Sequence, residues 1–163
     1  MERSPHANLR SVHRVRSPPN RKLVMFEQIE RIVIAVKNLD TSKEMFSDLL
    51  GIHFDAPLVD EKYALRAVYS HFGLELVEST AAGSVIEKYI ESRGEGVFRI
   101  VIKVKDMDEA IRQFEAKGVR QVGEITIGSM REVVFHPKDT NGMQIVLAEY
   151  RAKHPATVAA LEA

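Results

Sequence analysis

The clearest pattern of apolar and polar positions in this chain is a ten-residue segment that occurs twice. Residues 31–40 read RIVIAVKNLD and residues 99–108 read RIVIKVKDMD, with seven of ten positions identical. The β-branched run at the start of each copy predicts a strand. Apolar residues then recur every three to four positions until Gly51 or Gly118, which is typical of a helix with a glycine at its C-terminal end. Each half of the chain therefore begins with a strand and a helix.

The remainder of each half follows the alternating pattern of strands. β-rich segments separated by turn residues occur at residues 52–59, 62–70, 74–77, 119–127, 131–136 and 143–150. Between the halves, a capping-box sequence at residues 84–87 predicts a short helix. One such unit is too small to bury its own apolar face, so the two copies must pack together. We expect an α+β fold in which tandem βαβββ modules form a curved mixed sheet around a cleft.

The same pattern sets the expected domain limits. Residues 1–24 contain two Ser-Pro pairs, no apolar periodicity and six basic residues against one acidic residue, which predicts a disordered basic arm. An equally open interpretation is that translation begins at Met25. We expect one domain at 25–150, followed by a tail at 151–163. Its parts are module one at 26–80, a linker helix at 81–96 and module two at 97–150.

Composition removes several functional classes. The chain has no cysteine, which excludes disulfides and thiolate metal sites, and no apolar run long enough to span a membrane. It has no tryptophan and only 7% aromatic residues, and from residue 25 onward 17 basic residues face 22 acidic ones, so a nucleic-acid surface is not expected. The arm lacks the apolar core of a signal peptide. We expect a cytoplasmic homodimer that binds neither nucleic acid nor membranes.

Side-chain alternation along the predicted strands places charged residues in the cleft. On the first strand of each module, the aliphatic face must lie against the helix, which leaves Arg31 and Arg99 on the open face. The same count places Glu75 in the cleft, on the closing strand of the first module. Lys103 extends the positive charge beside Arg99. Two arginines and one carboxylate are therefore expected in one concavity.

Three interpretations of this group are open. Glu75 can be held between the two guanidinium groups as a structural cluster that fixes the packing of the modules. Alternatively, a partly neutralised arginine pair can bind a carboxylate or phosphate of a ligand. In the third interpretation, the arginines simply reach water at the strand ends. The residues alone do not separate these three.

The repeat, the βαβββ order and the sequence FHPKDTNG at residues 135–142 together resemble the vicinal oxygen chelate superfamily, which contains glyoxalases, bleomycin-resistance proteins and extradiol dioxygenases. Within it, residues 26–150 are most similar to methylmalonyl-CoA epimerases. The resemblance implies a divalent metal held by two histidines and two Glu or Gln residues on four strands. The corresponding positions in this chain are Arg31, Arg99, Glu75 and Val146. Because a guanidinium cannot coordinate a metal, we expect no catalytic metal and no other cofactor.

The resemblance also implies candidate roles for individual residues. Glu75 is the expected acid/base for proton abstraction beside a thioester, while Arg31 and Arg99 supply the positive charge that the metal would have supplied. Lys103 extends this positive patch. A bulge in the last strand would bring Gln144 or Glu149 into the cleft, and Lys138, beside the His136 turn, is placed to meet a phosphate of a CoA-like ligand.

We therefore expect a metal-independent protein that binds or isomerises a small acidic or acyl-CoA-like ligand. If it is an enzyme, it is an isomerase, an epimerase or a lyase. The alternative is a protein that sequesters its ligand without catalysis, as bleomycin-resistance proteins do. A third possibility is a structural or partner-binding module whose cleft is filled by the arginine and glutamate cluster.

Overall fold

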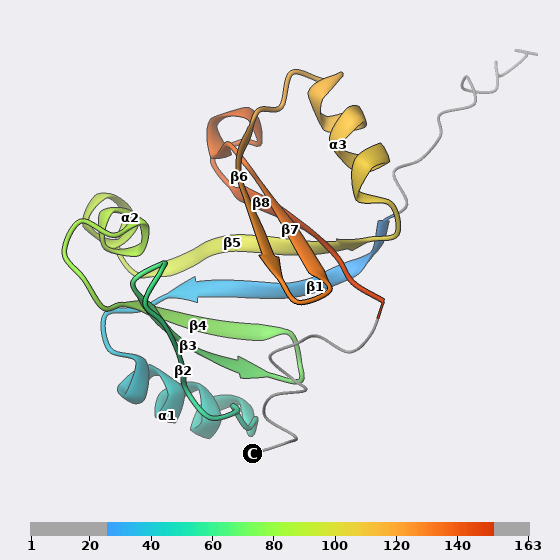
Figure 1. Ribbon diagram of the computed structural model, residues 1–163. Coiled ribbons are helices and arrows are strands. Elements are labelled where there is room, and N and C mark those ends of the chain that lie inside the picture. The colour runs from blue at the N-terminus through green and yellow to red at the C-terminus, as the bar shows by residue number, and fades with distance from the viewer. Residues whose placement is uncertain (1–25, 152–163) are drawn as a thin grey trace, which may run out of the picture.

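The two copies of the repeated segment form the central strands of a single curled sheet. The computed structural model describes residues 26–151, in which the copies begin within β1 (Phe26–Ala35) and β5 (Gly96–Val104), paired antiparallel (Figure 1). The other strands are β2 (Leu58–Asp60), β3 (Leu65–Ser70), β4 (Leu74–Ser79), β6 (Gln121–Ile127), β7 (Met130–Phe135) and β8 (Gln144–Glu149). Their order in the sheet is β2-β3-β4-β1-β5-β8-β7-β6. The predicted α+β fold of tandem βαβββ modules is confirmed.

Helices α1 (Leu39–Leu50) and α3 (Met107–Glu115) cover the same face of the sheet, one in each module. Each begins where a side chain accepts a backbone N–H: Asn38 accepts from Thr41 at 2.9 Å, and Asp106 accepts from Glu109 at 2.9 Å. α1 ends at Gly51, whose φ of 64° lies in the left-handed region that glycine tolerates best. The sequence pattern therefore predicts both helices because caps and apolar spacing agree.

Two apolar clusters join these helices to the sheet. The α1 cluster contains Val36, Leu39, Phe54, Val68 and Leu76, and the α3 cluster contains Val104, Met107, Ala110, Val133, Phe135 and Leu147. In the second, the rings of Phe114 and Phe135 lie with centroids 4.4 Å apart. A fully buried Leu, Val or Phe side chain contributes roughly 1.5–3 kcal/mol, so this packing is the main stabilising term of each module.

Helix α2 (Val85–Arg93) lies at the opposite face of the sheet and connects the modules. It begins at Ser84, whose hydroxyl accepts the backbone N–H of Glu87 at 3.0 Å, as the capping-box sequence predicts. Ile86, Tyr89 and Ile90 pack against the sheet. The Tyr89 ring meets Phe98 edge-on at 5.1 Å, so α2 closes one end of this face.

One sequence prediction is wrong over most of its length. The β-rich segment at residues 52–59 forms a strand only from Leu58, and residues 52–57 are irregular. Pro57 has no N–H to donate to a ladder, and the Asp55 N–H bonds to the Tyr69 carbonyl at 2.7 Å outside the regular pairing. The predicted arm at 1–24 and the tail after Arg151 lie outside the described residues. None of the helices within residues 26–151 is long and apolar enough to cross a membrane.

Candidate functional site

The face of the sheet opposite α1 and α3 carries the polar residues of the candidate site, and we call it the inner face. Its apolar part is a cluster that includes Val33, Ala35, Ala67, Val77, Val101, Val134, Val146 and Ala148. The register of the strands places the polar side chains of Arg31, Tyr69, Glu75, Arg99, Lys103, Glu132 and Gln144 in line with these residues. The predicted alternation therefore brings Arg31, Glu75 and Arg99 to one face, together with Lys103 and Gln144.

Arg31 lies at the centre of a buried ion-pair cluster. Its Nε donates to Glu75 Oε2 at 2.5 Å, its Nη2 donates to Glu132 Oε1 at 2.7 Å, and its Nη1 contacts Glu30. Arg31, Glu75 and Glu132 are only 7%, 6% and 4% exposed. Burial alone would lower the pKa of the guanidinium, but the three carboxylates together raise that pKa well above its ordinary value. Arg31 therefore stays charged, and its charge is already matched.

Two tyrosines form hydrogen bonds with carboxylates of this cluster. Tyr69 hydrogen-bonds Glu75, and its ring lies 5.7 Å from Arg31 Cζ. Burial and the nearby Glu75 charge raise the pKa of Tyr69 above its ordinary value. Tyr150 hydrogen-bonds Glu30, and burial again raises its pKa. Both phenols therefore stay protonated and donate to carboxylates.

Arg99 has a different environment. Its Nε is buried and has no hydrogen-bond partner among the described residues, and its Cζ lies 4.3 Å from the centroid of the Phe98 ring. Burial lowers the pKa of this guanidinium from its ordinary value. Opposite Arg99 in the ladder, Gln144 has a buried side-chain oxygen that is also without a partner within residues 26–151. A buried polar atom without a partner costs free energy, and the described residues supply no partner for either of these two atoms.

The two lysines that the sequence predicts as ligand-binding residues lie in different parts of the structure. Lys103 lies beside the Arg31 cluster, with Nζ 3.3 Å from Glu27 Oε2 and 4.4 Å from the Tyr150 ring centroid. Lys138 is exposed in the short 3₁₀ helix η1 (Pro137–Asp139), between β7 and β8. The structure therefore brings Lys103 to the inner face and leaves Lys138 on a turn.

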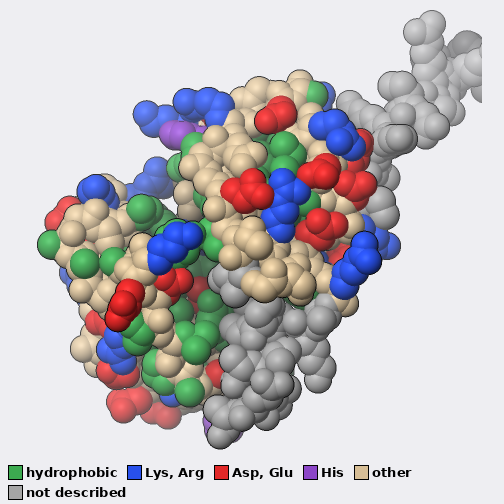
Figure 2. Space-filling view, viewed as in Figure 1, with side chains coloured by type: hydrophobic (Ala, Val, Ile, Leu, Met, Phe, Trp, Pro, Cys, Tyr) green, Lys and Arg blue, Asp and Glu red, His purple; other side chains and the backbone are tan. Residues whose placement is uncertain are grey.

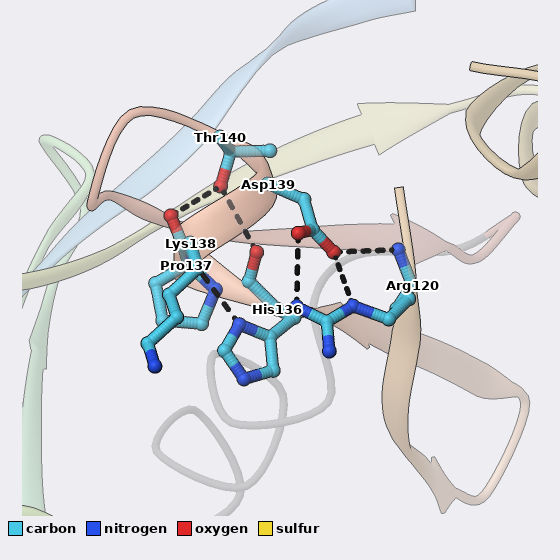
Figure 3. A network of polar contacts seen from close by, with 6 residues as sticks. All are labelled: Arg120, His136, Pro137, Lys138, Asp139 and Thr140. Carbon is cyan, nitrogen blue, oxygen red and sulfur yellow. Dashed lines mark hydrogen bonds and ion pairs between the residues drawn. The ribbon is translucent and has the colours of Figure 1, made fainter. Parts of the chain in front are cut away.

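That turn is fixed by its own polar contacts (Figure 3). The Lys138 N–H donates to His136 Nδ1 at 3.1 Å. Arg120 donates to Asp139 from its backbone N–H, its Nε and its Nη2 at 3.1, 2.8 and 2.9 Å. His136 therefore has a structural role in the turn, as expected for a histidine at a strand end.

Sequence reasoning missed Glu132 and Tyr69. In β7, Val133 and Phe135 pack against α3, so strict alternation places Glu132 on the inner face. In β3, the same count with Val68 toward α1 places Tyr69 beside Glu75. The alternation that located Arg31 on the first strand would thus have found both residues on the middle strands.

Ordinary surface charges behave differently from the inner face. In the space-filling view, basic and acidic side chains are interspersed over the second module (Figure 2). Arg131 there contacts Asp108 and Glu124, each at 2.6 Å. Such pairs neutralise one another in water, whereas the partly buried Arg99 forms no ion pair within residues 26–151.

The donor set of the inner face does not fit the divalent metal that the family resemblance implies. Arg31, Arg99 and Val146 hold three of the four ligand positions, and none of these side chains coordinates a metal. Within residues 26–151, no group of three or more His, Cys, Asp or Glu side chains is arranged to hold an ion. Glu75, at the fourth position, bonds to Arg31 and Tyr69.

A cavity of about 190 Å³ opens beside the Arg31 cluster. Its lining includes Glu30, Arg31, Asp55, Tyr69, Ser70 and His71. His71 Nε2 lies 3.6 Å from Asp55 Oδ1 at this mouth. The cavity thus gives access to the cluster from the β3–β4 turn.

Comparison with known proteins identifies the family. The sequence model of the Glyoxalase/Bleomycin resistance protein/Dioxygenase superfamily matches residues 28–147, and the chain belongs to this superfamily. The ethylmalonyl-CoA/methylmalonyl-CoA epimerase of Cereibacter sphaeroides is 26% identical over 133 residues, which cover 77% of this chain and 99% of that protein.

Solved structures agree with this assignment. The crystal structure of methylmalonyl-CoA epimerase from Mycobacterium tuberculosis has a TM-score of 0.72 and 26% identity, covering 85% of this chain and 95% of that one. A variant of the Streptomyces coelicolor methylmalonyl-CoA epimerase has a TM-score of 0.70 and 29% identity, covering 78% of this chain and 99% of that one. That structure contains 2-nitronate-propionyl-CoA. The chain thus resembles methylmalonyl-CoA epimerases in sequence and in fold.

Proposed function

We propose that the inner face binds a small acidic or acyl-CoA-like ligand and isomerises it without a metal ion. The observation that carries this proposal is that Arg99, whose buried Nε has no hydrogen-bond partner among residues 26–151, lies on the same face as the Glu75 carboxylate. The similarity to epimerases, one of them in complex with an acyl-CoA analogue, supports the ligand class. A guanidinium supplies positive charge and donors to an anionic oxygen, so it can replace part of what a cation does there.

The proposed chemistry is a one-base proton transfer beside a thioester carbonyl. Glu75 accepts the proton from the α carbon, and the C–H electron pair is delocalised onto the thioester oxygen as an enolate. A proton delivered from water to the opposite face of the α carbon gives the isomer, and Glu75 releases its own proton to water. Arg99 and Gln144 bind the anionic group, and Arg31 positions Glu75 through its 2.5 Å contact. Lys103 extends the positive charge, and Lys138 meets a phosphate of the CoA part.

The second candidate is a protein that sequesters the ligand without reaction. Its support is that Glu75 accepts hydrogen bonds from both Arg31 and Tyr69, so its carboxylate already has partners within the protein. The inner face would then only bind the anion. A homodimer and a cytoplasmic location stay predictions under either function.

Deuterium wash-in at the α carbon of methylmalonyl-CoA separates the two. The full chain is incubated in heavy water with chelator and, in parallel, with added cobalt, and the exchange is followed by mass spectrometry. We expect exchange that survives the chelator and is lost in Glu75→Gln, while Glu78→Gln, on the same strand, serves as the matched control. Exchange only with cobalt contradicts metal independence. Binding of the thioester without exchange in either condition favours sequestration.

A further inference from the structure

We infer that the inner face contains a subsite for one carboxylate of the ligand, at Arg99, where the ligand takes the place that glutamate carboxylates take at Arg31. This inference rests on the proposed ligand-binding function of the inner face and names the chemical group that is bound. It comes from comparing equivalent positions in the two modules. The contacts of Arg31 in the first module therefore serve as a template: they indicate which chemical group would bind at the equivalent Arg99.

The equivalent positions follow from the repeat and the strand register. Arg31 and Arg99 occupy the same place in the repeated segment, so Glu30 corresponds to Phe98. Val33 pairs with Glu75, and its counterpart Val101 pairs with Val146, so Glu75 corresponds to Val146.

The third position is on the middle strand of each module. In the first module, β3 pairs Ala67 with Val77 of β4, and in the second, β7 pairs Glu132 with Ala148 of β8. Because Val77 and Ala148 face the equivalent residues Ala35 and Lys103, Ala67 corresponds to Glu132. All three carboxylates around Arg31 therefore have uncharged counterparts around Arg99: Phe98, Val146 and Ala67.

The unsatisfied atom agrees with this comparison. The Nε of Arg31 donates to Glu75, whereas the Nε of Arg99 is buried without a partner in the described part of the chain. A Glu side chain exceeds that of Ala by one CH₂–COO⁻ group, so the difference between Glu132 and Ala67 has the size of acetate. A ligand carboxylate at Arg99 would restore the interaction that Arg31 makes within the protein.

The surroundings select a carboxylate over a phosphate. A guanidinium binds a planar carboxylate with two parallel hydrogen bonds. The walls at Val146 and Ala67 are apolar and buried, so a doubly charged phosphate would lose more hydration there than one arginine replaces. Gln144 adds a neutral amide, which can turn either its oxygen or its NH₂ toward the ligand. The subsite therefore fits a singly charged carboxylate on a short aliphatic group.

The test uses the full chain with acetate, propionate and inorganic phosphate at constant ionic strength. Binding is measured by the chemical shifts of the Gln144 side-chain amide and by the rise in melting temperature. We expect saturable shifts with acetate and propionate and none with phosphate. Arg99→Met is expected to weaken carboxylate binding at least about tenfold, as loss of a charge-assisted hydrogen bond does. Carboxylate binding that persists in this variant, or a response to phosphate alone, overturns the inference.

A reciprocal pair of variants tests the template directly. Ala67→Glu supplies the missing carboxylate and should abolish the response to acetate. Glu132→Ala opens the same space at Arg31, but Glu30 and Glu75 still match the arginine charge, so it should add no second acetate response. If Ala67→Glu does not fold, Glu132→Ala and Arg99→Met still decide the matter. A second acetate response in Glu132→Ala contradicts the inference, because acetate would then bind an arginine whose charge is already matched. Deuterium exchange with the thioester is scored separately, so carboxylate binding without exchange supports this subsite while it removes the proposed isomerase activity.

Discussion

The two modules are alike on the outer face of the sheet and differ on the inner face. Both pack a helix against their strands with Leu, Val and Phe, and both begin the helix after a capping Asn or Asp. On the inner face, Arg31 contacts three carboxylates, whereas Arg99 forms no ion pair with any described residue. Both modules therefore share the apolar packing of a helix against the outer face of the sheet, which stabilises each module. On the inner face, the copies differ in the residues that surround the repeated arginine.

The largest expected effect is the difference between Arg31→Met and Arg99→Met. Removing Arg31 leaves Glu30, Glu75 and Glu132 close together without a cation, and breaking such a buried pair costs about 3–5 kcal/mol. Removing Arg99 removes an unsatisfied buried donor and one contact with Phe98, so we expect a change of at most about 1 kcal/mol. Urea unfolding of both variants measures the free energies. Equal losses would mean that the two arginines do not differ in the way their contacts suggest.

The next effect compares equivalent turns, β3–β4 and β7–β8. A Cβ at Gly73 would lie 3.0 Å from the Glu30 carbonyl oxygen, whereas a Cβ at Gly142 would lie no closer than 3.6 Å to the Arg93 guanidinium. Both glycines have a left-handed φ, of 79° and 84°, so Ala costs roughly 1–3 kcal/mol at either position. We expect Gly73→Ala to cost about 1 kcal/mol more than Gly142→Ala, since only there must backbone move. Thermal unfolding of the two variants gives the difference, and a larger loss for Gly142→Ala would contradict it.

A smaller effect is expected for Glu132→Gln. The amide oxygen still accepts from Arg31 Nη2, and Glu30 and Glu75 still match the arginine charge, so we expect a loss of about 1 kcal/mol or less. Glu132→Ala serves as the comparison, because it also removes the acceptor and should cost more. Both are measured by urea unfolding. A loss for Glu132→Gln as large as that for Arg31→Met would show that the cluster depends on this one carboxylate.

The sequence allowed the fold and part of the site to be predicted. Repetition of residues 31–40 at 99–108 was enough to predict both modules, because the same local preferences occur twice. Alternation then predicted that Arg31, Glu75 and Arg99 share one face, and the register agrees with it. What the sequence did not show is which arginine has partners.

The reason lies in two residues whose placement depends on long-range or irregular geometry. Glu30 directly precedes Arg31 on β1, so strict alternation would place the two side chains on opposite faces of the sheet. The register shift between Ile29 and Arg31 lets its carboxylate reach the guanidinium instead. Glu132 comes from β7, and only the sheet order brings it to β1. The sequence therefore predicted that Arg31, Glu75 and Arg99 share the inner face, but not that Glu30 and Glu132 also contact Arg31 there.

The smallest expected effect is a loss of local stability at low pH, expected in the β7–β8 turn and not in the β3–β4 turn. Hydrogen bonds from the Arg120 side chain and backbone N–H lower the pKa of Asp139 from 3.8 to about 2. Because the folded pKa is lowered, the stabilisation is complete above pH 3.8 and is lost as the pH falls through about 2. The Gly142 and Gly73 amides, which donate to Pro137 at 2.7 Å and Ser70 at 3.0 Å, report on the equivalent turns. In the native chain, we expect the hydrogen-exchange protection of Gly142 to fall relative to that of Gly73 as the pH falls from 3.8 to about 2. In Asp139→Asn, the protection of Gly142 should lose this pH dependence. If the protection of both amides falls in parallel, acid acts on the whole sheet and the turns do not differ.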